Sequence, residues 1–183
     1  MNTVKKVVVI GGTGLIGSKA VRLLQDAGHE AVVASSRNGI NAYTGEGLGK
    51  ALAGADAVID VSNMMSFDKQ ALVDFFGTSS RNLTSAGKAA GVRHHVVLSI
   101  VNADRLAANP YMAGKLVQEK VVASSGQPYT IVRATQFHEF IETLANAYSA
   151  DDSVRVPDID FQPIAAADVA AALVEAALDE PKN

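Results

Sequence analysis

The sequence contains no cysteine, and this absence excludes disulfide bonds, thiolate metal sites and a cysteine nucleophile. It also contains no basic patch. The formal net charge is -3 and only short pairs such as Lys5 and Lys6 adjoin, so a nucleic acid is not an expected partner. No apolar run approaches the roughly 18 residues that a membrane span needs, and the first ten residues lack the features of a signal peptide. We therefore expect a cytoplasmic protein that binds neither nucleic acid nor a membrane.

Several motifs of other protein classes are missing as well. There is no G-x-S-x-G elbow and no Walker A lysine, so neither a hydrolase nor a P-loop enzyme is indicated. His138 and Glu142 could share a helix face, but two ligands are too few for a metal site. His94 and His95 are adjacent in a strand pattern and would point to opposite faces. We therefore expect no bound metal.

Short apolar segments rich in Val and Ile recur without polar alternation, which is the pattern of a parallel sheet covered on both faces. The expected strands are Val7–Ile10, Ala31–Ala34, Ala57–Val61, Val96–Ile100 and Tyr129–Val132. With 183 residues, of which 48% are hydrophobic, the chain fits one domain of the usual size of about 100 to 200 residues.

Helical patterns lie between these strands. A stripe from Ile16 to Ala27 ends before Gly28, and Asn109 with Pro110 can start a helix that runs to about Ser124. The other expected helices are Thr44–Ala53, Asp68–Ala90, Gln136–Tyr148 and Ala166–Leu178. This alternation predicts a single doubly wound α/β domain of the Rossmann type over residues 1–183, in which residues 136–183 contribute the substrate side.

The stretch GGTGLIG, residues 11–17, follows the first strand and opens the first helix. Gly12, Gly14 and Gly17 match G-x-G-x-x-G, and Gly11, Gly14 and Gly17 match a looser G-x-x-G-x-x-G. Without side chains, the amides of this turn can approach a pyrophosphate, which the positive end of the helix dipole also favours. A tight turn that serves only helix packing is the alternative, but the strand-to-helix context favours a dinucleotide site.

The end of the second strand indicates which dinucleotide is bound. An NAD site of this fold carries an acidic residue about 20 residues past the glycines, whereas this chain has Ser35, Ser36 and Arg37. The guanidinium of Arg37 can pair with a 2′-phosphate, so we expect NADP(H) rather than NAD(H). A solvated loop arginine is the alternative. The cofactor should also border the residues after the third strand, Val61, Ser62 and Asn63.

Three polar residues form a candidate catalytic set. Ser99 ends the fourth strand, and Tyr111 and Lys115 follow at i and i+4 of a helix, where they share a face. A neighbouring ammonium lowers the pKa of a phenol from about 10. We therefore expect Tyr111 to protonate a substrate carbonyl, Lys115 to tune it and hold the nicotinamide ribose, and Ser99 to orient the carbonyl oxygen. A core tyrosine beside a snorkelling lysine is the alternative.

Five stretches together resemble the NmrA-like, atypical branch of the short-chain dehydrogenase/reductase superfamily. They are GGTGLIG, SSR at the end of the second strand, ADAVIDVSN, SGQPYTIVRATQFHEF and FQPIAAADVAAALVEAAL. The resemblance covers nearly the whole chain and implies an NAD(P)-binding Rossmann domain. It implies Arg37 at the 2′-phosphate contact and Ser99, Tyr111 and Lys115 at the positions of the superfamily's catalytic set.

The resemblance also implies cofactor contacts elsewhere. The segment Thr135, Gln136 and Phe137, after the fifth strand, is implied to cover the nicotinamide end. In the glycine-rich loop the expected contacts are Gly11, Thr13, Gly14, Leu15, Ile16 and Gly17. An apolar substrate pocket could be lined by Met64, Met65, Phe67, Phe75 and Phe76. For the two phenylalanines on the long helix, Phe75 and Phe76, a place in the core is favoured.

Two features separate the chain from the branch that it resembles. Members of this branch often lack the tyrosine and act as redox sensors or regulators, whereas Tyr111 is present here. They also usually continue past the helix at Ala166–Leu178 with another strand and more of a substrate domain. The substrate lid is therefore expected to be small, to come from a partner subunit in a homodimer, or to lie outside this sequence.

The favoured function is an NADPH-dependent oxidoreductase that transfers hydride to a small carbonyl, enone or quinone, with Tyr111 as the proton donor. A non-catalytic NADP(H)-binding redox sensor is the alternative from a different class. A nucleotide-sugar epimerase or dehydratase would use the same loop and the same Tyr-Lys chemistry, but it would need a larger substrate domain.

Overall fold

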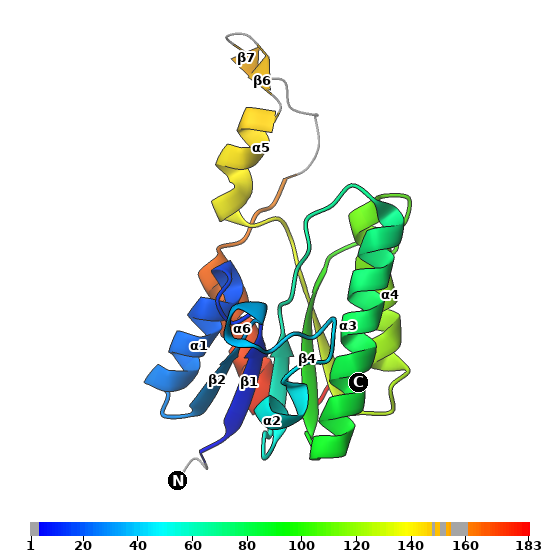
Figure 1. Cartoon of the computed structure of the whole chain (residues 1–183). Helices are drawn as coiled ribbons and strands as arrows, with labels where there is room; N and C mark the ends of the chain where they lie inside the picture. Colours follow the sequence, from blue (N-terminus) through cyan, green and yellow to red (C-terminus); the bar gives the residue numbers. More distant parts are fainter. Residues whose placement is uncertain (1–3, 148, 151–152, 155–160) are drawn as a thin grey trace.

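The computed structural model describes residues 4–147, 149–150, 153–154 and 161–183. A parallel sheet lies at its centre in the order β2-β1-β3-β4-β5 (Figure 1). The strands are β1 (Lys6–Ile10), β2 (Glu30–Ala34), β3 (Ala57–Asp60), β4 (His94–Ile100) and β5 (Tyr129–Ala134). The predicted doubly wound sheet is confirmed. Its switch point lies between β1 and β3, because the chain passes from β1 to β2 on one side and then crosses to β3 on the other.

Helices cover both faces of the sheet. On one face α1 (Leu15–Asp26) packs beside α6 (Ala166–Leu178), and the other face carries α2 (Leu48–Leu52), α3 (Lys69–Ala90) and α4 (Pro110–Ala123) (Figure 1). Alternate residues of β1 therefore enter two separate cores: Val7 and Val9 join the core with α1 and α6, and Val8 and Ile10 join the core with α2 and α3. Burial on both faces explains the unbroken apolar runs of the sequence.

The start of α4 sets the position of two candidate catalytic residues. The side chain of Asn109 caps this helix by accepting from the amides of Tyr111 and Met112. Tyr111 therefore lies in the first turn of α4. The helix also approaches α3 closely, because a Cβ at Gly114 would lie 2.7 Å from Cδ2 of Phe76. The fully buried ring of Phe76 fills the space that this glycine leaves.

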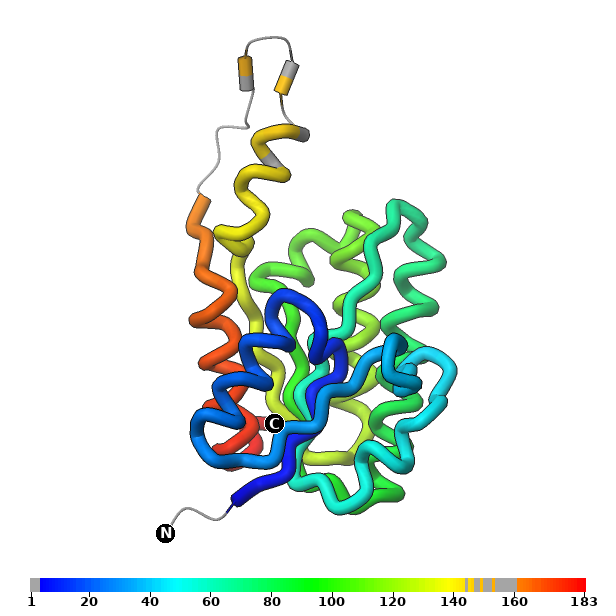
Figure 2. The backbone as a smooth tube through the Cα atoms, turned by 60° about the vertical axis from the view of Figure 1, so that its left-hand side comes forward, coloured from blue at the N-terminus to red at the C-terminus, as the bar shows by residue number. Residues whose placement is uncertain are grey.

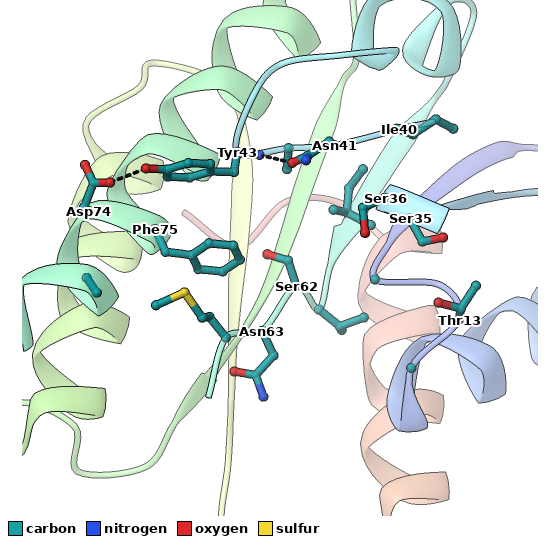
Figure 3. Close-up of a pocket in the computed structure, with 17 residues that line it drawn as sticks. Thr13, Ser35, Ser36, Ile40, Asn41, Tyr43, Ser62, Asn63, Asp74 and Phe75 are labelled. Atoms are coloured by element: carbon teal, nitrogen blue, oxygen red, sulfur yellow. Dashed lines mark hydrogen bonds between the residues drawn. The ribbon is translucent and has the colours of Figure 1, made fainter. Parts of the chain in front are cut away.

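The helix expected over Thr44–Ala53 is shorter in the structure. Only α2 is helical there, because Gly45 and Gly47 have φ angles of +81° and +72°. This left-handed backbone interrupts a right-handed helix. The segment before α2 instead forms a loop that brings Asn41 and Tyr43 to the carboxyl ends of the strands (Figure 3).

The segment after β5 does not form the single helix expected over Gln136–Tyr148. Phe137 pairs with Ile164 in a parallel bridge, and η2 (His138–Phe140) and α5 (Ile141–Ala147) follow; Tyr148 lies outside the described residues. Together with the antiparallel pair β6 (Ser149–Ala150) and β7 (Ser153–Val154), α5 projects beyond the body of the domain (Figures 1 and 2). In contrast, α6 returns to the core against α1. Among the described helices, none is both long and apolar enough to span a bilayer.

Replacing Gly17 by alanine should destabilise the protein. A Cβ at Gly17 would lie 2.7 Å from Cα of Gly12 and closer still to the carbonyl oxygen of Gly11, so α1 would have to move away from the loop. Such overpacking costs about 1 to 3 kcal/mol, which urea unfolding would show as a lower midpoint. Gly49→Ala is the matched control, because a Cβ there meets no atom within 4 Å. Equal stability of the two variants would contradict the tight contact.

Candidate functional site

The glycine-rich loop joins β1 to α1 at the carboxyl ends of the strands. The amides of Gly11 and Gly12 donate to the carbonyl of Ala34, and the amide of Gly14 donates to the carbonyl of Gly11. These three amides are therefore engaged within the protein. The amides of residues 15–17, in the first turn of α1, have no intrahelical acceptor, and the N-cap Gly14 brings no capping side chain. We therefore expect an anion to bind at the first helical turn, where these amides are free.

The glycines of this loop serve different purposes. Gly11 has φ +79°, and a Cβ there would lie 2.8 Å from the carbonyl oxygen of Val61, so only glycine lets the loops after β1 and β3 meet. A Cβ at Gly14 would meet only the carbonyl oxygen of Gly11, at 3.2 Å. Gly14 also lines open space. Close approach of a ligand is the stronger reason for glycine at this second position.

Two cavities open beside the loop. The first has a volume of about 600 Å³ and lies towards α3 and the end of β2. The second has a volume of about 620 Å³ and lies towards the ends of β4 and β5 and the start of α4. Five residues line both cavities: Gly11, Gly14, Val61, Ser62 and Asn63. The two cavities therefore adjoin at the switch point, where doubly wound domains bind their ligands, and we refer to both together as the trench.

The first cavity has an aromatic wall (Figure 3). The rings of Tyr43 and Phe75 stack with their centroids 5.9 Å apart, and the hydroxyl of Tyr43 donates to Asp74. Ser35 and Ser36 line the cavity across from this wall (Figure 3). A flat aromatic surface that faces hydroxyl groups suits a planar heterocycle and its sugar. The helical periodicity of the sequence favours a core position for both Phe75 and Phe76. This prediction is wrong for Phe75, which lines the cavity, and confirmed for Phe76, which is fully buried.

Arg37 lines neither cavity. It is exposed on the turn η1 (Ser36–Asn38). The side chain of Asn38 holds this turn by accepting from the amide of Ser35 at 2.8 Å and donating to the carbonyl of Val33 at 2.6 Å. The turn places Arg37 beside the first cavity, next to Ser36, which does line it. Its pairing with a 2′-phosphate stays a prediction.

The second cavity brings the predicted catalytic residues together. Ser99, Tyr111 and Lys115 all line it, as do Leu15, Ile16, Gly17, Gln136 and Phe137. The hydroxyl of Tyr111 donates to Oδ1 of Asn63 at 2.7 Å. Tyr111 thereby connects the first turn of α4 to the loop that follows β3. Thr13, the remaining predicted contact in the glycine-rich loop, lines the first cavity (Figure 3).

The electrostatic relation expected between Tyr111 and Lys115 is not present in this arrangement. Burial raises the pKa of Tyr111 to about 12. The ammonium of Lys115 does not oppose this effect, because it donates to Oε1 of Gln118 and lies 4.7 Å from the centroid of the Phe76 ring. Burial lowers the pKa of Lys115 to about 8, although the carboxylates of Asp60 and Glu119 act to raise it. Sequence spacing could place the two residues on one face but could not fix where the ammonium points.

Ser99 presents its hydroxyl to the second cavity. Its Oγ is buried and lies close enough to Glu119 to lower the pKa of that carboxylate, but it makes no hydrogen bond of ordinary geometry in the part of the chain that the structure describes. The nearby Glu119 is held by Arg133, whose guanidinium donates to both carboxylate oxygens at 2.9 and 2.7 Å. Burial raises the pKa of Glu119, but the bonds from Arg133 and the weaker approach of Ser99 lower it overall. A buried hydroxyl without a partner costs free energy, which a polar ligand atom in this cavity would recover.

The segment after β5 forms one wall of the second cavity. Gln136 accepts from the amide of Ile164, and Ile164 accepts from the amide of His138. This pairing holds the segment against the start of α6. The rings of Phe137 and Phe140 stack with centroids 5.8 Å apart, and both line the cavity. The segment that the family resemblance assigned to the nicotinamide end is therefore in the right place to cover a ligand.

Sequence reasoning missed several lining and supporting residues. Asp60 ends the apolar run AVID, and a carboxylate at the end of a buried strand could have signalled a polar network. Gln118 stands three residues after Lys115 on the same helix, where side chains are neighbours. Asn41, Tyr43 and Asp74 gave no signal, since a loop and a helix distant in sequence bring them together. In the part of the chain described, no group of three or more potential metal ligands occurs.

The fold and the trench define an NAD(P)-binding domain of the Rossmann type. The family described as NAD(P)H-binding matches residues 40–180, and the chain belongs to this family. The resemblance to the atypical short-chain dehydrogenase/reductases is thereby confirmed.

Proteins similar to this chain differ in what their names describe. Photosystem II assembly factor Ycf39 of Synechocystis sp. is 31% identical over 173 residues, which cover 87% of this chain and 50% of that protein. The NAD(P)H azoreductase of Xenophilus azovorans is 29% identical over 188 residues, which cover 93% of this chain and 62% of that protein. The structure of the Citrobacter sp. triphenylmethane reductase complexed with NADP(H) superposes with a TM-score of 0.69 at 18% identity, and the match covers 96% of this chain and 66% of the reductase. This chain thus spans about half to two thirds of the length of these proteins.

The depressed pKa of Lys115 should make stability increase with pH. The unfolded chain holds this proton up to its ordinary pKa of 10.5, whereas the folded protein releases it near pH 8, so the free energy of unfolding should rise between about pH 8 and pH 10. Each pH unit is worth about 1.4 kcal/mol at most. Urea unfolding of the parent and of Lys115→Met should show this rise in the parent alone.

Lys120→Met removes an exposed lysine from the same helix and serves as the control, which should keep the parent's pH dependence. A Lys115→Met variant with an unchanged slope over this range would show that Lys115 is not the group responsible.

Proposed function

We propose that the protein is an NADPH-dependent oxidoreductase that reduces a small, uncharged carbonyl, enone or quinone. The observation that carries this proposal is that Tyr111, Lys115 and Ser99 line one cavity, which begins at the glycine-rich loop. Membership of the NAD(P)H-binding family supports the nicotinamide cofactor. The similarity to an NAD(P)H azoreductase supports a reduction.

The residues present fit a dinucleotide laid along the trench. The amides of residues 15–17 would bind the pyrophosphate, because they are free at the positive end of α1. The first cavity would take the adenosine against Tyr43 and Phe75, with Ser35 and Ser36 towards its ribose. The nicotinamide would lie in the second cavity. There the unpartnered hydroxyl of Ser99 marks a place for a polar atom.

When bound, the nicotinamide supplies a hydride to the electrophilic carbon of the substrate. Tyr111 donates its phenolic proton to the substrate oxygen, so that a carbonyl gains a hydride at carbon and a proton at oxygen and becomes an alcohol. Ser99 donates a hydrogen bond to the same oxygen and orients it. For Lys115 to stabilise the phenolate that Tyr111 leaves, its ammonium, which donates to Gln118 in this structure, would have to turn towards Tyr111. Asn63 holds the phenolic hydrogen until a substrate oxygen takes its place.

The lining of the second cavity favours an apolar acceptor. Met65, Phe67, Met112, Phe137 and Phe140 contribute to it. Met65 and Phe67 are 85% and 100% exposed, so a substrate would cover apolar surface that now faces water. Lys115 is the one cationic side chain among the described lining residues. A nucleotide sugar, with its diphosphate, would find little charge there, so the epimerase or dehydratase alternative is less favoured.

A second candidate function is a cofactor sensor that does not turn over. The hydrogen bond from Tyr111 to Asn63 and the pKa of about 12 make the phenol a poor acid, and the similar Ycf39 is named as an assembly factor. A sensor would bind NADPH without consuming it on any carbonyl, enone or quinone, and would bind a partner with different affinities in the NADP and NADPH states. An oxidoreductase consumes NADPH with at least one of these acceptors.

Tyr111→Phe should keep NADPH affinity within about twofold but lose about 100-fold or more in kcat, because general acid catalysis contributes factors of this size. Stopped-flow NADPH oxidation and fluorescence titration would measure the two quantities. Tyr129→Phe, at the start of β5, is the control and should leave both unchanged. Parental turnover by Tyr111→Phe on every accepted substrate would disprove the acid role.

Arg37→Ala should weaken NADPH binding by about tenfold or more and leave NADH binding unchanged, because a charge-assisted hydrogen bond to a phosphate contributes about 1.5 to 3 kcal/mol. Calorimetric titration with both nucleotides would measure this difference. Arg22→Ala removes another exposed arginine, on α1, and should alter neither affinity. An unchanged NADPH affinity in Arg37→Ala would mean that this arginine does not read the 2′-phosphate.

A further inference from the structure

A fully buried carboxylate lies behind the candidate catalytic residues. Asp60 is the last residue of β3 and has no exposed surface. Its Oδ1 accepts from the amide of Ser62 at 2.9 Å, and its Oδ2 accepts from Nε2 of Gln118 at 2.8 Å. Both carboxylate oxygens are therefore hydrogen-bonded. Because Ser62 lines both cavities, Asp60 also fixes the backbone of the trench at the switch point.

Gln118 links this carboxylate to Lys115. A carboxylate only accepts hydrogen bonds, so the amide group of Gln118 must present its NH₂ to Asp60. Its carbonyl oxygen is then forced to face the other way, where the ammonium of Lys115 donates to it. The orientation of the amide is thus set by Asp60 and not by Lys115. All three side chains are buried, so these bonds lie in a low-dielectric environment, where hydrogen bonds are stronger than in water.

Other charged or titratable groups surround the ammonium. Glu119 lies on the same helix and is engaged by Arg133 from β5. On β4, the ring of His95 is fully buried and interacts electrostatically with Asp60, and burial lowers its pKa. From α3 the ring of Phe76 lies against the ammonium. Glu119 is already paired with Arg133. Asp60 is therefore the carboxylate that Gln118 connects to the ammonium of Lys115 through two hydrogen bonds.

We infer that Gln118 and Asp60 are positioning residues for Lys115: the Asp60–Gln118 bridge holds its ammonium, charged, at the second cavity. This inference rests on the proposed function for the use that Lys115 makes of its charge. One hydrogen of the Lys115 ammonium is bound to Gln118, and the other two remain available to a ligand. Tyr111 and Lys115 are then both anchored to the carboxyl end of β3, through Asn63 and Asp60 respectively.

Removing either part of the bridge should make Lys115 release its proton more easily. Gln118→Met keeps the length of the side chain but removes the acceptor, and Asp60→Asn keeps the shape but removes the charge. In each variant we expect the titration midpoint of Lys115 to fall by about half a pH unit or more, which is about a threefold change in proton affinity. The midpoint would be followed by NMR of protein labelled with ¹⁵N at the lysine side chains, with Lys115→Met used to assign the signal. The double variant should shift the midpoint by less than the sum of the two single changes, because both act through one chain of contacts.

Gln127→Met is the matched control. Gln127 is also a buried glutamine, at the opposite ends of the strands, where its Nε2 donates to the carbonyl of Val92 and its side chain interacts with His95. It therefore controls for a change around His95, which also interacts with Asp60, while the Gln118 bridge stays in place. This variant should lose stability without moving the Lys115 midpoint. If Gln118→Met and Asp60→Asn fold and leave the midpoint where Gln127→Met leaves it, the positioning role is wrong. If only one of these two variants folds, the same comparison is made with the Lys115 midpoint of that variant alone.

The pH profile of kcat/KM separates this inference from the proposed function. In an oxidoreductase, the alkaline limb of the profile should move down with the Lys115 midpoint in both bridge variants and stay in place in Gln127→Met. A shifted midpoint in a protein that consumes no NADPH with any acceptor would support the bridge and overturn the proposed function. If the bridge variants turn over substrate and both the alkaline limb of their kcat/KM profile and the Lys115 midpoint stay unchanged, the proposed function is supported and the bridge is overturned.

Discussion

The close contact between two backbone loops at the switch point is the constraint on which the rest of the structure depends. A Cβ at Gly11 would clash with the carbonyl oxygen of Val61, and Gly17 lets α1 pack against Gly11 and Gly12. The first turn of α1, with its free amides, is thereby brought beside the ends of β1 and β3. The two cavities share the residues of this contact, so a ligand that spans both must cross it.

The carboxyl end of β3 gives the site its electrostatic character. Asp60 is buried in the middle strand of the sheet, and its two carboxylate oxygens accept from the backbone amide of Ser62 and from Gln118. Burial of the Lys115 ammonium costs free energy, and a carboxylate linked to it by hydrogen bonds reduces that cost. Three residues after Asp60, Asn63 accepts from the hydroxyl of Tyr111. One short loop thus organises both side chains that the proposed reaction needs.

The site has two regions that differ in structure: one would hold the cofactor, and the other would determine which substrate binds. The cofactor side is built on the sheet and on helices that pack into its cores. The substrate side consists of the exposed Met65 and Phe67 on one loop and of the stacked Phe137 and Phe140 on another. Family membership and fold describe the first part. In the proposed reaction, the chemistry of the acceptor would depend on the second part, which is apolar and mostly uncharged among the described residues.

The sequence by itself determined the strands, most of the helices, the glycine-rich loop and the residue types of the candidate catalytic set, because these features depend on local periodicity, turns and spacing. The tertiary structure alone decided which amides stay free, where the ammonium of Lys115 points and which residues face the first cavity. Asp60 and Gln118 are 58 residues apart, and Tyr43 and Asp74 are 31 apart. Such pairs form only when the sheet and its helices have packed, and the pKa of a buried group follows from that packing and not from its neighbours in the chain.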